Sequence, residues 1–183
     1  MPNIRSFICI TFPREIVKEI ARIQDIILKT RFKGSLTSPE NLHLTLKFLG
    51  EIQLEKLEKV KSLLSNVEFK SFEARLQYIG TFSHKKQPRI AWMKISSKLL
   101  FDLQKTIDDA LSPLFPKEKR FMSHLTLARI KHVNSPPDFI NYIKQFNPKK
   151  LKFQISSFKL MSSELKPLGP KYTLIKECEL PTG

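Results

Sequence analysis

The tetrapeptide His-Leu-Thr-Leu occurs twice in this chain, at residues 43–46 and 124–127, and it accounts for two of the four histidines. Successive side chains of a β-strand point to opposite faces. On a strand, each copy would therefore place its histidine and threonine on one face and its two leucines on the other. We expect the leucines to anchor both strands in a core, with the histidines and threonines facing each other across a cleft.

The sequence pattern around the two motifs also repeats, which predicts a duplicated fold. Each half is expected to run strand, helix, motif strand, helix, strand, and residues 172–180 add a final strand. The corresponding segments are 7–12 with 88–93, 14–31 with 97–111, 54–65 with 138–145, and 72–76 with 153–155. No Pro-, Gly- or Ser-rich linker separates the halves, which argues against two independent domains. We expect one bilobal α+β domain over residues 1–183 with pseudo-twofold symmetry, in which two antiparallel sheets flank a central cleft and the helices lie outside.

The charge balance is strongly basic, with 32 Lys and Arg against 17 Asp and Glu and a formal net charge of +15. Such an excess favours a polyanionic partner, nucleic acid first, although lysines can also simply solvate a surface. Cys9 and Cys178 fit no metal or redox spacing, which suggests reduced, structural thiols. No segment approaches the roughly 20 apolar residues of a membrane span. We expect a cytoplasmic monomer that does not associate with membranes.

Paired histidines suit acid–base chemistry on a phosphodiester. Imidazole titrates near neutrality, so one ring can act as a base while the other acts as an acid. Opening a strained cyclic phosphodiester needs both, because the attacking water loses a proton and the departing ribose oxygen gains one. The hydroxyls of Thr45 and Thr126 are candidates to donate hydrogen bonds to the phosphate oxygens. By strand alternation, Lys47 shares the face of His43 and Thr45 and is a further candidate for phosphate contact.

Other kinds of site fit the sequence less well. Two imidazoles could bind zinc or copper, but no cysteine is nearby, and Glu40 and Glu51 have no counterparts beside the second motif. Ser123 adjoins His124, but neighbours on a strand face opposite ways and no G-x-S-x-G elbow exists. No P-loop or G-x-G-x-x-G motif indicates a nucleotide cofactor. We therefore expect chemistry without metal or cofactor, while structural histidines remain the alternative.

Both motifs resemble those of the 2H phosphoesterase superfamily, and in particular the RNA 2′,3′-cyclic phosphodiesterases historically called 2′-5′ RNA ligases. The resemblance extends over essentially the whole chain, through residues 41–50 (NLHLTLKFLG), 88–92 (PRIAW), 124–129 (HLTLAR) and 163–172 (SELKPLGPKY). It implies a cleft between two lobes and hydrolysis of a 2′,3′-cyclic phosphate RNA end to a 2′-phosphate, without metal or nucleotide cofactor. It also implies that His43 is the proton donor, that His124 is the base that activates water, and that Thr45 and Thr126 hold the phosphate.

Arg129 occupies the arginine position of the family pattern H-x-T-x-x-R, where it is associated with substrate. Strand alternation gives a different expectation, because Arg129 is five residues from His124 and would face away unless the strand bulges or ends. Phe48 is the equivalent residue of the first half and is predicted to be core. Both interpretations of Arg129, substrate contact and solvated strand end, remain open.

Further basic and aromatic residues are candidates for guiding RNA. Phe82 and Tyr78 could stack on a base, although strand aromatics are usually core. His84 and His132 have no partner pattern and are expected to be structural or surface residues. The basic residues that could flank the groove are Arg75, His84, Lys85, Lys86 and Arg89.

Three functions are compatible with these observations. The first is an RNA 2′,3′-cyclic phosphodiesterase, with 2′-5′ ligation of tRNA halves as a secondary activity. The second is the same chemistry on a small nucleotide, such as ADP-ribose cyclic phosphate, or on a 2′-5′ oligonucleotide. The third is a non-catalytic RNA-binding module, against which the intact His and Thr of both motifs argue.

Overall fold

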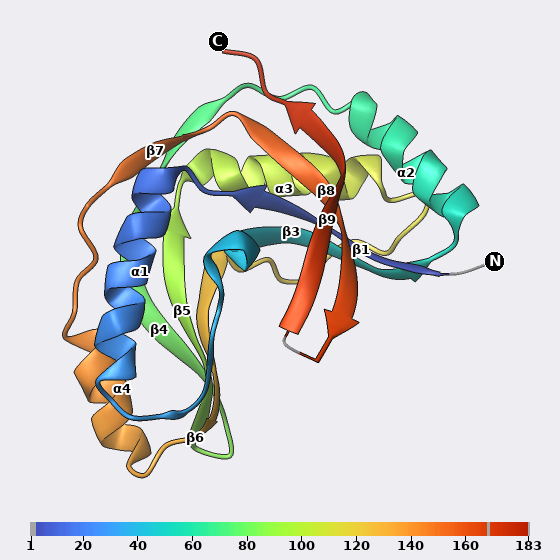
Figure 1. Cartoon of the computed structure of the whole chain (residues 1–183). Helices are drawn as coiled ribbons and strands as arrows, with labels where there is room; N and C mark the ends of the chain where they lie inside the picture. Colours follow the sequence, from blue (N-terminus) through green and yellow to red (C-terminus); the bar gives the residue numbers. More distant parts are fainter. Residues whose placement is uncertain (1–2, 168, 183) are drawn as a thin grey trace.

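The computed structural model describes residues 3–167 and 169–182, so residues 1, 2, 168 and 183 of the expected domain lie outside the description, Leu168 of the segment 163–172 among them. Helices separate most of the strands, and the described chain ends in three consecutive strands (Figure 1). The strands are β1 (Ile4–Thr11), β2 (Lys33–Leu36), β3 (His43–Ile52), β4 (Phe72–His84), β5 (Gln87–Ser96), β6 (His124–His132), β7 (Lys152–Ile155), β8 (Ser157–Lys166) and β9 (Gly169–Glu179). The helices are α1 (Arg14–Leu28), α2 (Leu54–Ser65), α3 (Lys98–Ala110) and α4 (Pro136–Lys144), with a 3-10 turn, η1 (Pro39–Asn41).

The strands form one curled antiparallel sheet in the order β7-β4-β5-β6-β3-β1-β8-β9. β2 pairs with the end of β6, on the edge away from β5. The two motif strands are adjacent at the centre of the sheet, where Leu44 on β3 lies opposite Leu125 on β6. That is the single point at which β3 and β6 pair in the described residues. The α+β class and the pseudo-twofold arrangement are confirmed, and the two expected sheets prove to be joined at this point.

The lobes do not coincide with the sequence halves. One lobe contains β3, β1, β8 and β9, with α2 and α3 packed against it, and the other contains β6, β5, β4 and β7, with α1 and α4 (Figure 1). The strand that ends the first half, β4, therefore pairs with strands of the second. Helix α1 crosses as well, since Gln24 donates a hydrogen bond to the carbonyl oxygen of Leu127 on β6 at 2.9 Å. This exchange ties the two sequence halves together through strand pairing and a buried hydrogen bond.

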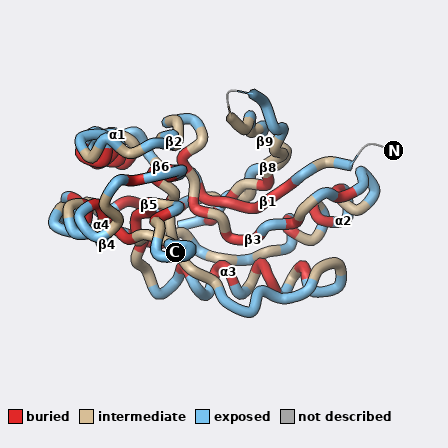
Figure 2. Tube along the Cα trace, turned by 90° about the horizontal axis from the view of Figure 1, so that it is seen from below, coloured by how far each residue is buried: buried red, intermediate tan, exposed pale blue. Residues whose placement is uncertain are grey.

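The core lies between the convex face of the sheet and the helices. Each helix buries one apolar face, as in α1, where Ile16, Ile20, Ile23 and Ile27 recur at helical spacing. Buried positions accordingly run along the central strands and the inner helix faces (Figure 2). No helix within residues 3–167 and 169–182 is long and apolar enough to cross a membrane. The concave face of the sheet is left open for a site.

Both cysteines are free thiols. Cys9 is buried on β1, and this burial raises its pKa to about 12. A thiol with so high a pKa stays protonated at neutral pH and is a poor nucleophile. The expectation of reduced, structural cysteines agrees with this environment.

Candidate active site

The motif strands present their two faces as the sequence predicts. Leu44, Leu46, Leu125 and Leu127 are at most 2% exposed and lie in the core. The histidine and threonine of each motif are half-buried and line a cavity on the concave face of the sheet. The buried leucines therefore fix the strand faces on which the polar side chains stand.

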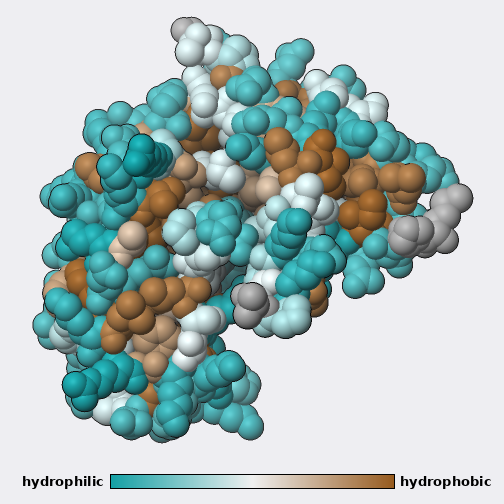
Figure 3. All heavy atoms as spheres, in the orientation of Figure 1, coloured by the Kyte–Doolittle hydropathy of each residue, from teal (hydrophilic) through white to brown (hydrophobic). Residues whose placement is uncertain are grey.

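A cavity of about 590 Å³ lies between the lobes, a size typical of small-molecule sites. The space-filling view shows the surface hollowed beside the β8–β9 hairpin (Figure 3). Asn41 ties this hairpin to η1, because its side-chain amide donates to the carbonyl oxygen of Pro170 at 2.9 Å. The residues that line the cavity include Arg5, Phe7, Ser35, Asn41, His43, Thr45, Phe48, Ile90, His124, Thr126, Arg129, Leu165 and Tyr172.

The two histidines are held in the same way. The Nδ1 atom of His43 lies 2.7 Å from the carbonyl oxygen of Asn41, and that of His124 lies 2.9 Å from the carbonyl oxygen of Met122. A carbonyl oxygen can only accept a hydrogen bond, so Nδ1 must carry a proton in both rings. In each histidine this leaves Nε2 as the atom that can gain or lose a proton. The pair is thus prepared for proton transfer.

Aromatic rings surround both imidazoles. Phe7 and Tyr172 lie 4.9 and 5.2 Å from the ring of His43, between centroids. Phe82 and Trp92 lie 5.2 and 6.3 Å from the ring of His124. Packing against these rings limits the orientations that the imidazoles can adopt.

Burial lowers the pKa of His43 below its ordinary value. The hydrogen bond to the carbonyl of Asn41 opposes this effect, while the positive charges of Arg129 and His124 add to it. Free of substrate, the His43 ring therefore loses its proton more readily than an ordinary imidazole. An anion beside Arg129 would reverse part of this effect by offsetting the positive charge.

One extra residue follows the threonine in each motif, and it exchanges the faces of the strand to which the next side chains point. On β3, Thr45 pairs with Cys9 whereas Lys47 pairs with Ile8, so Leu46 is an extra residue. On β6, Leu127 is extra in the same way, between the pairs Trp92–Thr126 and Ala91–Ala128. A β-bulge of this kind breaks the alternation of faces. Residues after the bulge therefore point to the face opposite to the one that strict two-residue alternation from the histidine predicts.

The bulge on β6 brings Arg129 to the same face as His124 and Thr126. Arg129 lines the cavity, and Phe48, its counterpart on β3, does so too. The prediction that Phe48 is core was wrong, because its side chain is 49% exposed. The guanidinium of Arg5 lies 5.0 Å from the Phe48 ring centroid, within the range of a cation–π contact. An arginine and an aromatic ring thus face the cavity just beyond the two motifs.

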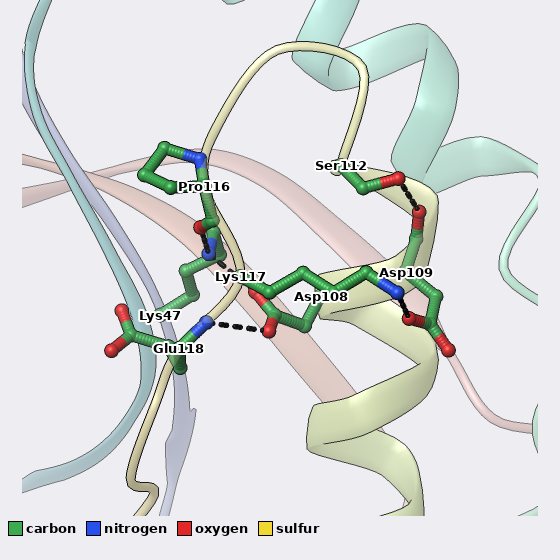
Figure 4. Close-up of polar contacts among 7 residues, drawn as sticks. All are labelled: Lys47, Asp108, Asp109, Ser112, Pro116, Lys117 and Glu118. Carbon is green, nitrogen blue, oxygen red and sulfur yellow. Dashed lines mark hydrogen bonds and ion pairs between the residues drawn. The ribbon is translucent and has the colours of Figure 1, made fainter.

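The prediction that Lys47 faces the cleft was also wrong. Lys47 is 2% exposed and points to the helical side of β3, where it forms an ion pair with Asp108 of α3 and donates to the carbonyl oxygen of Pro116 (Figure 4). Asp108 also accepts a hydrogen bond from the backbone N–H of Glu118 at 2.7 Å. The physical reason is the bulge at Leu46, which rotates Lys47 away from His43 and Thr45. Its role is to join β3 to the loop that leads into β6.

Other residues singled out in the sequence do not line the cavity. Arg75 pairs with Ser96 and Lys152, many residues along β4 from the turn at residues 85–86, so it does not flank the cavity. Tyr78 contacts Trp92 and Phe82 contacts His124, and neither ring lines the cavity. His84 and His132 are exposed at the ends of β4 and β6, in agreement with a surface role.

Several cavity residues were not identified from the sequence. Phe7 and Arg5 come from β1, and Tyr172 comes from the last strand, 129 residues beyond His43. The available signal was indirect: Tyr172 closes the segment 163–172 that carries the family resemblance. Within residues 3–167 and 169–182, no group of three or more His, Cys, Asp or Glu side chains is placed to bind a metal ion.

Comparison with known proteins identifies the family. The sequence model of the family described as LigT-like phosphoesterase matches residues 10–92 and 95–172, which include both motifs and Arg129. The chain belongs to this family. The resemblance to 2H phosphoesterases seen in the sequence is thereby confirmed.

Relatives of the LigT-like chain share its full length. The RNA 2′,3′-cyclic phosphodiesterase of Methanocaldococcus jannaschii is 35% identical over 94% of this chain and 99% of its own. The protein of the same name from Thermotoga maritima is 31% identical over 98% of this chain and 97% of its own. The crystal structure of the Thermus thermophilus protein TT0787 superposes with a TM-score of 0.83 at 28% identity, covering 97% of this chain and 98% of that one. Both sequence and fold thus match LigT-like proteins from end to end.

Proposed function

We propose that this LigT-like chain is an RNA 2′,3′-cyclic phosphodiesterase that hydrolyses a cyclic phosphate end to a 2′-phosphomonoester. The observation that carries the proposal is the matched histidine pair, with each Nδ1 fixed by a backbone carbonyl and both rings facing one cavity. Relatives named for this activity support it over the full length.

In the proposed reaction, His124 Nε2 takes a proton from water as the water oxygen bonds to phosphorus. The bond between phosphorus and the ribose 3′ oxygen breaks, and His43 Nε2 gives its proton to that oxygen. The products are a 2′-phosphate and a free 3′-hydroxyl, so one water is consumed and both histidines end in exchanged protonation states. Solvent then restores them.

The same geometry accommodates a 5′-hydroxyl in place of water, which would give 2′-5′ ligation as a secondary activity. We propose tRNA-derived ends as the substrate for both reactions and a monomer acting in the cytoplasm as the working form. The monomer is supported by the cavity itself, to which one chain contributes both histidines, both threonines and Arg129.

The phosphate would be held by Thr45, Thr126 and Arg129. Both hydroxyls and the guanidinium reach the cavity from strands, which are rigid supports. Donors fixed where negative charge accumulates stabilise the transition state more than the ground state. These three residues would therefore act mainly on turnover rather than on substrate affinity.

Thr45→Val and Thr126→Val should each lower kcat by roughly 10²–10³-fold, the usual cost of removing one such donor. Valine keeps the branched shape on the strand and deletes the hydroxyl. Thr173→Val, on the exposed face of β9, is the matched control and should leave kcat unchanged. Turnover of a 2′,3′-cyclic mononucleotide by purified variants measures the effect. Unchanged kcat in both motif variants would mean that the threonines serve only the strand.

The pH dependence of kcat/KM should report the low pKa of His43. If His43 must be protonated, activity falls as the pH rises through its pKa, so burial and Arg129 place this basic limb below the pH expected for an ordinary histidine. Arg129→Gln removes a positive charge, raises the pKa of His43, and should move the basic limb to higher pH while lowering the rate. A shift of the acidic limb instead would make His43 the base.

The direct test is to incubate the protein with an oligoribonucleotide that ends in a 2′,3′-cyclic phosphate, with and without EDTA. We expect a 2′-phosphate end in both samples. Loss of activity in EDTA, restored by one particular divalent ion, would contradict the metal-free reaction. Turnover of a small cyclic nucleotide but not of the oligomer would favour the small-nucleotide alternative.

A further inference from the structure

Three chain segments that are rich in basic residues contain no Asp or Glu. They are residues 29–38, 83–91 and 128–135. The chain has 17 acidic residues, and none lies in these three segments. The segments can form one basic surface only if the fold brings them together.

The strand order places all three segments at one end of the sheet. β2 pairs with β6 with Lys33 opposite His132, and β5 pairs with β6 with Ile90 opposite Arg129. Arg89 donates to the carbonyl oxygen of Lys131 at 2.8 Å, which fixes the start of β5 beside the end of β6. In Figure 1 the β4–β5 hairpin and the end of β6 meet at the bottom of the molecule. We call the exposed side chains gathered here the basic rim, and they are Lys33, Lys85, Lys86, Arg89 and Lys131.

The basic rim continues the proposed active site. Ser35, Ile90 and Arg129 lie side by side across β2, β5 and β6, and all three line the cavity. Lys86, the nearer residue of the turn, is four residues from Ile90 along β5 and so lies roughly 13 Å beyond it, at about 3.3 Å per residue. Within residues 3–167 and 169–182, no ion pair involves a side chain of the rim. Lys29 and Arg31 are set apart, because they border a separate hollow that also contains Asp138.

The hairpin turn carries its two lysines at a conformational cost. Lys85 and Lys86 have φ angles of 48° and 65°, in the left-handed region that disfavours side chains with a Cβ. Two-residue turns of this type prefer Asn-Gly. Lysine at both positions is therefore a poor choice for the turn itself, which points to a use for the side chains.

The opposite border of the cavity is less basic. There Arg5 lies opposite Glu51 across β1 and β3. Glu164, next to Leu165 on β8, forms an ion pair with Lys166. A phosphodiester backbone leaving the cavity on this side would meet carboxylates as well as cations, whereas the three segments on the rim side contain no carboxylate side chain.

We propose that the basic rim binds the backbone phosphates of the nucleotides that precede the cyclic end, so that single-stranded RNA leaves the cavity over Arg129 and the β4–β5 turn. This proposal rests on the proposed function for the identity of the end held in the cavity. It adds the direction of the strand and the residues that favour RNA over a mononucleotide.

The test measures binding, which needs no turnover. The probe is a fluorescent single-stranded RNA of about ten nucleotides ending in a 2′-phosphate, titrated by anisotropy between about 50 and about 200 mM salt. The rim variant is Lys85→Gln/Lys86→Gln/Lys131→Gln. The matched control, with the same loss of charge at exposed positions elsewhere, is Lys70→Gln/Lys98→Gln/Lys105→Gln.

For the rim variant we expect RNA affinity to fall about tenfold or more at low salt. The slope of log K against log salt should become shallower by about 0.7 for each phosphate that the variant no longer neutralises, or roughly 2 for three phosphates. Affinity for a mononucleoside 2′-phosphate should stay within about twofold, and the control variant should bind RNA as the wild type does. An equal loss of affinity in the control, or no loss in the rim variant, would overturn the proposal.

A second variant separates the role of the turn from its stability. Lys85→Asn/Lys86→Gly gives the turn its preferred residues, so the melting temperature should rise while RNA affinity falls. A more stable protein with unchanged RNA affinity would remove the turn from the binding surface. Wild-type hydrolysis of a mononucleoside 2′,3′-cyclic phosphate, assayed in parallel, reports on the proposed function alone, so the two proposals fail separately.

Discussion

His43→Ala and His124→Ala should each lower the turnover of a 2′,3′-cyclic mononucleotide by roughly 10²–10⁴-fold or more, the usual contribution of a positioned acid or base. The reason is that both histidines line the cavity and a backbone carbonyl holds Nδ1 of each ring, which leaves Nε2 for proton transfer. The double variant should lose little beyond either single variant, because the two groups act as one unit. His84→Ala and His132→Ala, at exposed positions outside the cavity, are the controls and should retain wild-type rates. Full activity in either motif variant would end the two-histidine proposal.

A modified substrate can assign the two roles. If the leaving oxygen belongs to a group that departs without protonation, the acid is no longer needed. Such a substrate should restore much of the rate to His43→Ala and little to His124→Ala. The reverse outcome would exchange the roles, and it would agree with the low pKa of His43, which disfavours the protonated ring before substrate binds.

Lys47→Met should lower the free energy of unfolding by about 3–5 kcal/mol, the typical cost of removing one partner of a buried ion pair. The substitution leaves the carboxylate of Asp108 buried without its cation, and the carbonyl oxygen of Pro116 loses a donor. Asp108→Asn should be comparably harmful, because it leaves the ammonium of Lys47 without a charged partner. Urea denaturation measures both effects.

The double variant Lys47→Met/Asp108→Leu should cost clearly less than the sum of the single changes, because it leaves no buried charge unpaired. Lys59→Met, which breaks an exposed pair with Glu55 on α2, is the control and should change stability little. Additive losses in the double variant would show that the two side chains act independently. A negligible loss in Lys47→Met would contradict the buried pair itself.

The prediction for Lys47 shows where strand alternation stops being informative. Alternation places His43, Thr45 and the motif leucines correctly, because the strand is regular as far as the threonine and the extra residue after it is the motif's buried last leucine. One bulged residue later the same rule fails in both halves. It directs Lys47 toward the cavity and Arg129 away from it, and the fold does the opposite. Nothing in Leu46 or Leu127 marks a bulge, since the extra residue is defined by pairing with another strand.

The sequence by itself determined the local structure of the motifs and the types of side chain that they present on one face. The 3.6-residue period of α1 and the two-residue alternation of His-Leu-Thr-Leu depend on neighbours in the chain and are therefore readable without a fold. The duplication added the expectation that the two histidines act as a pair.

Only the tertiary structure decided which residues complete the site. Asp108 reaches Lys47 across 61 residues, and Tyr172 reaches His43 across 129. The basic rim exists because β2, β5 and β6 bring three segments to one end of the sheet. Strand register, bulges and the exchange of strands between lobes are set by packing between segments that are distant in the sequence. They therefore cannot be predicted from local periodicity.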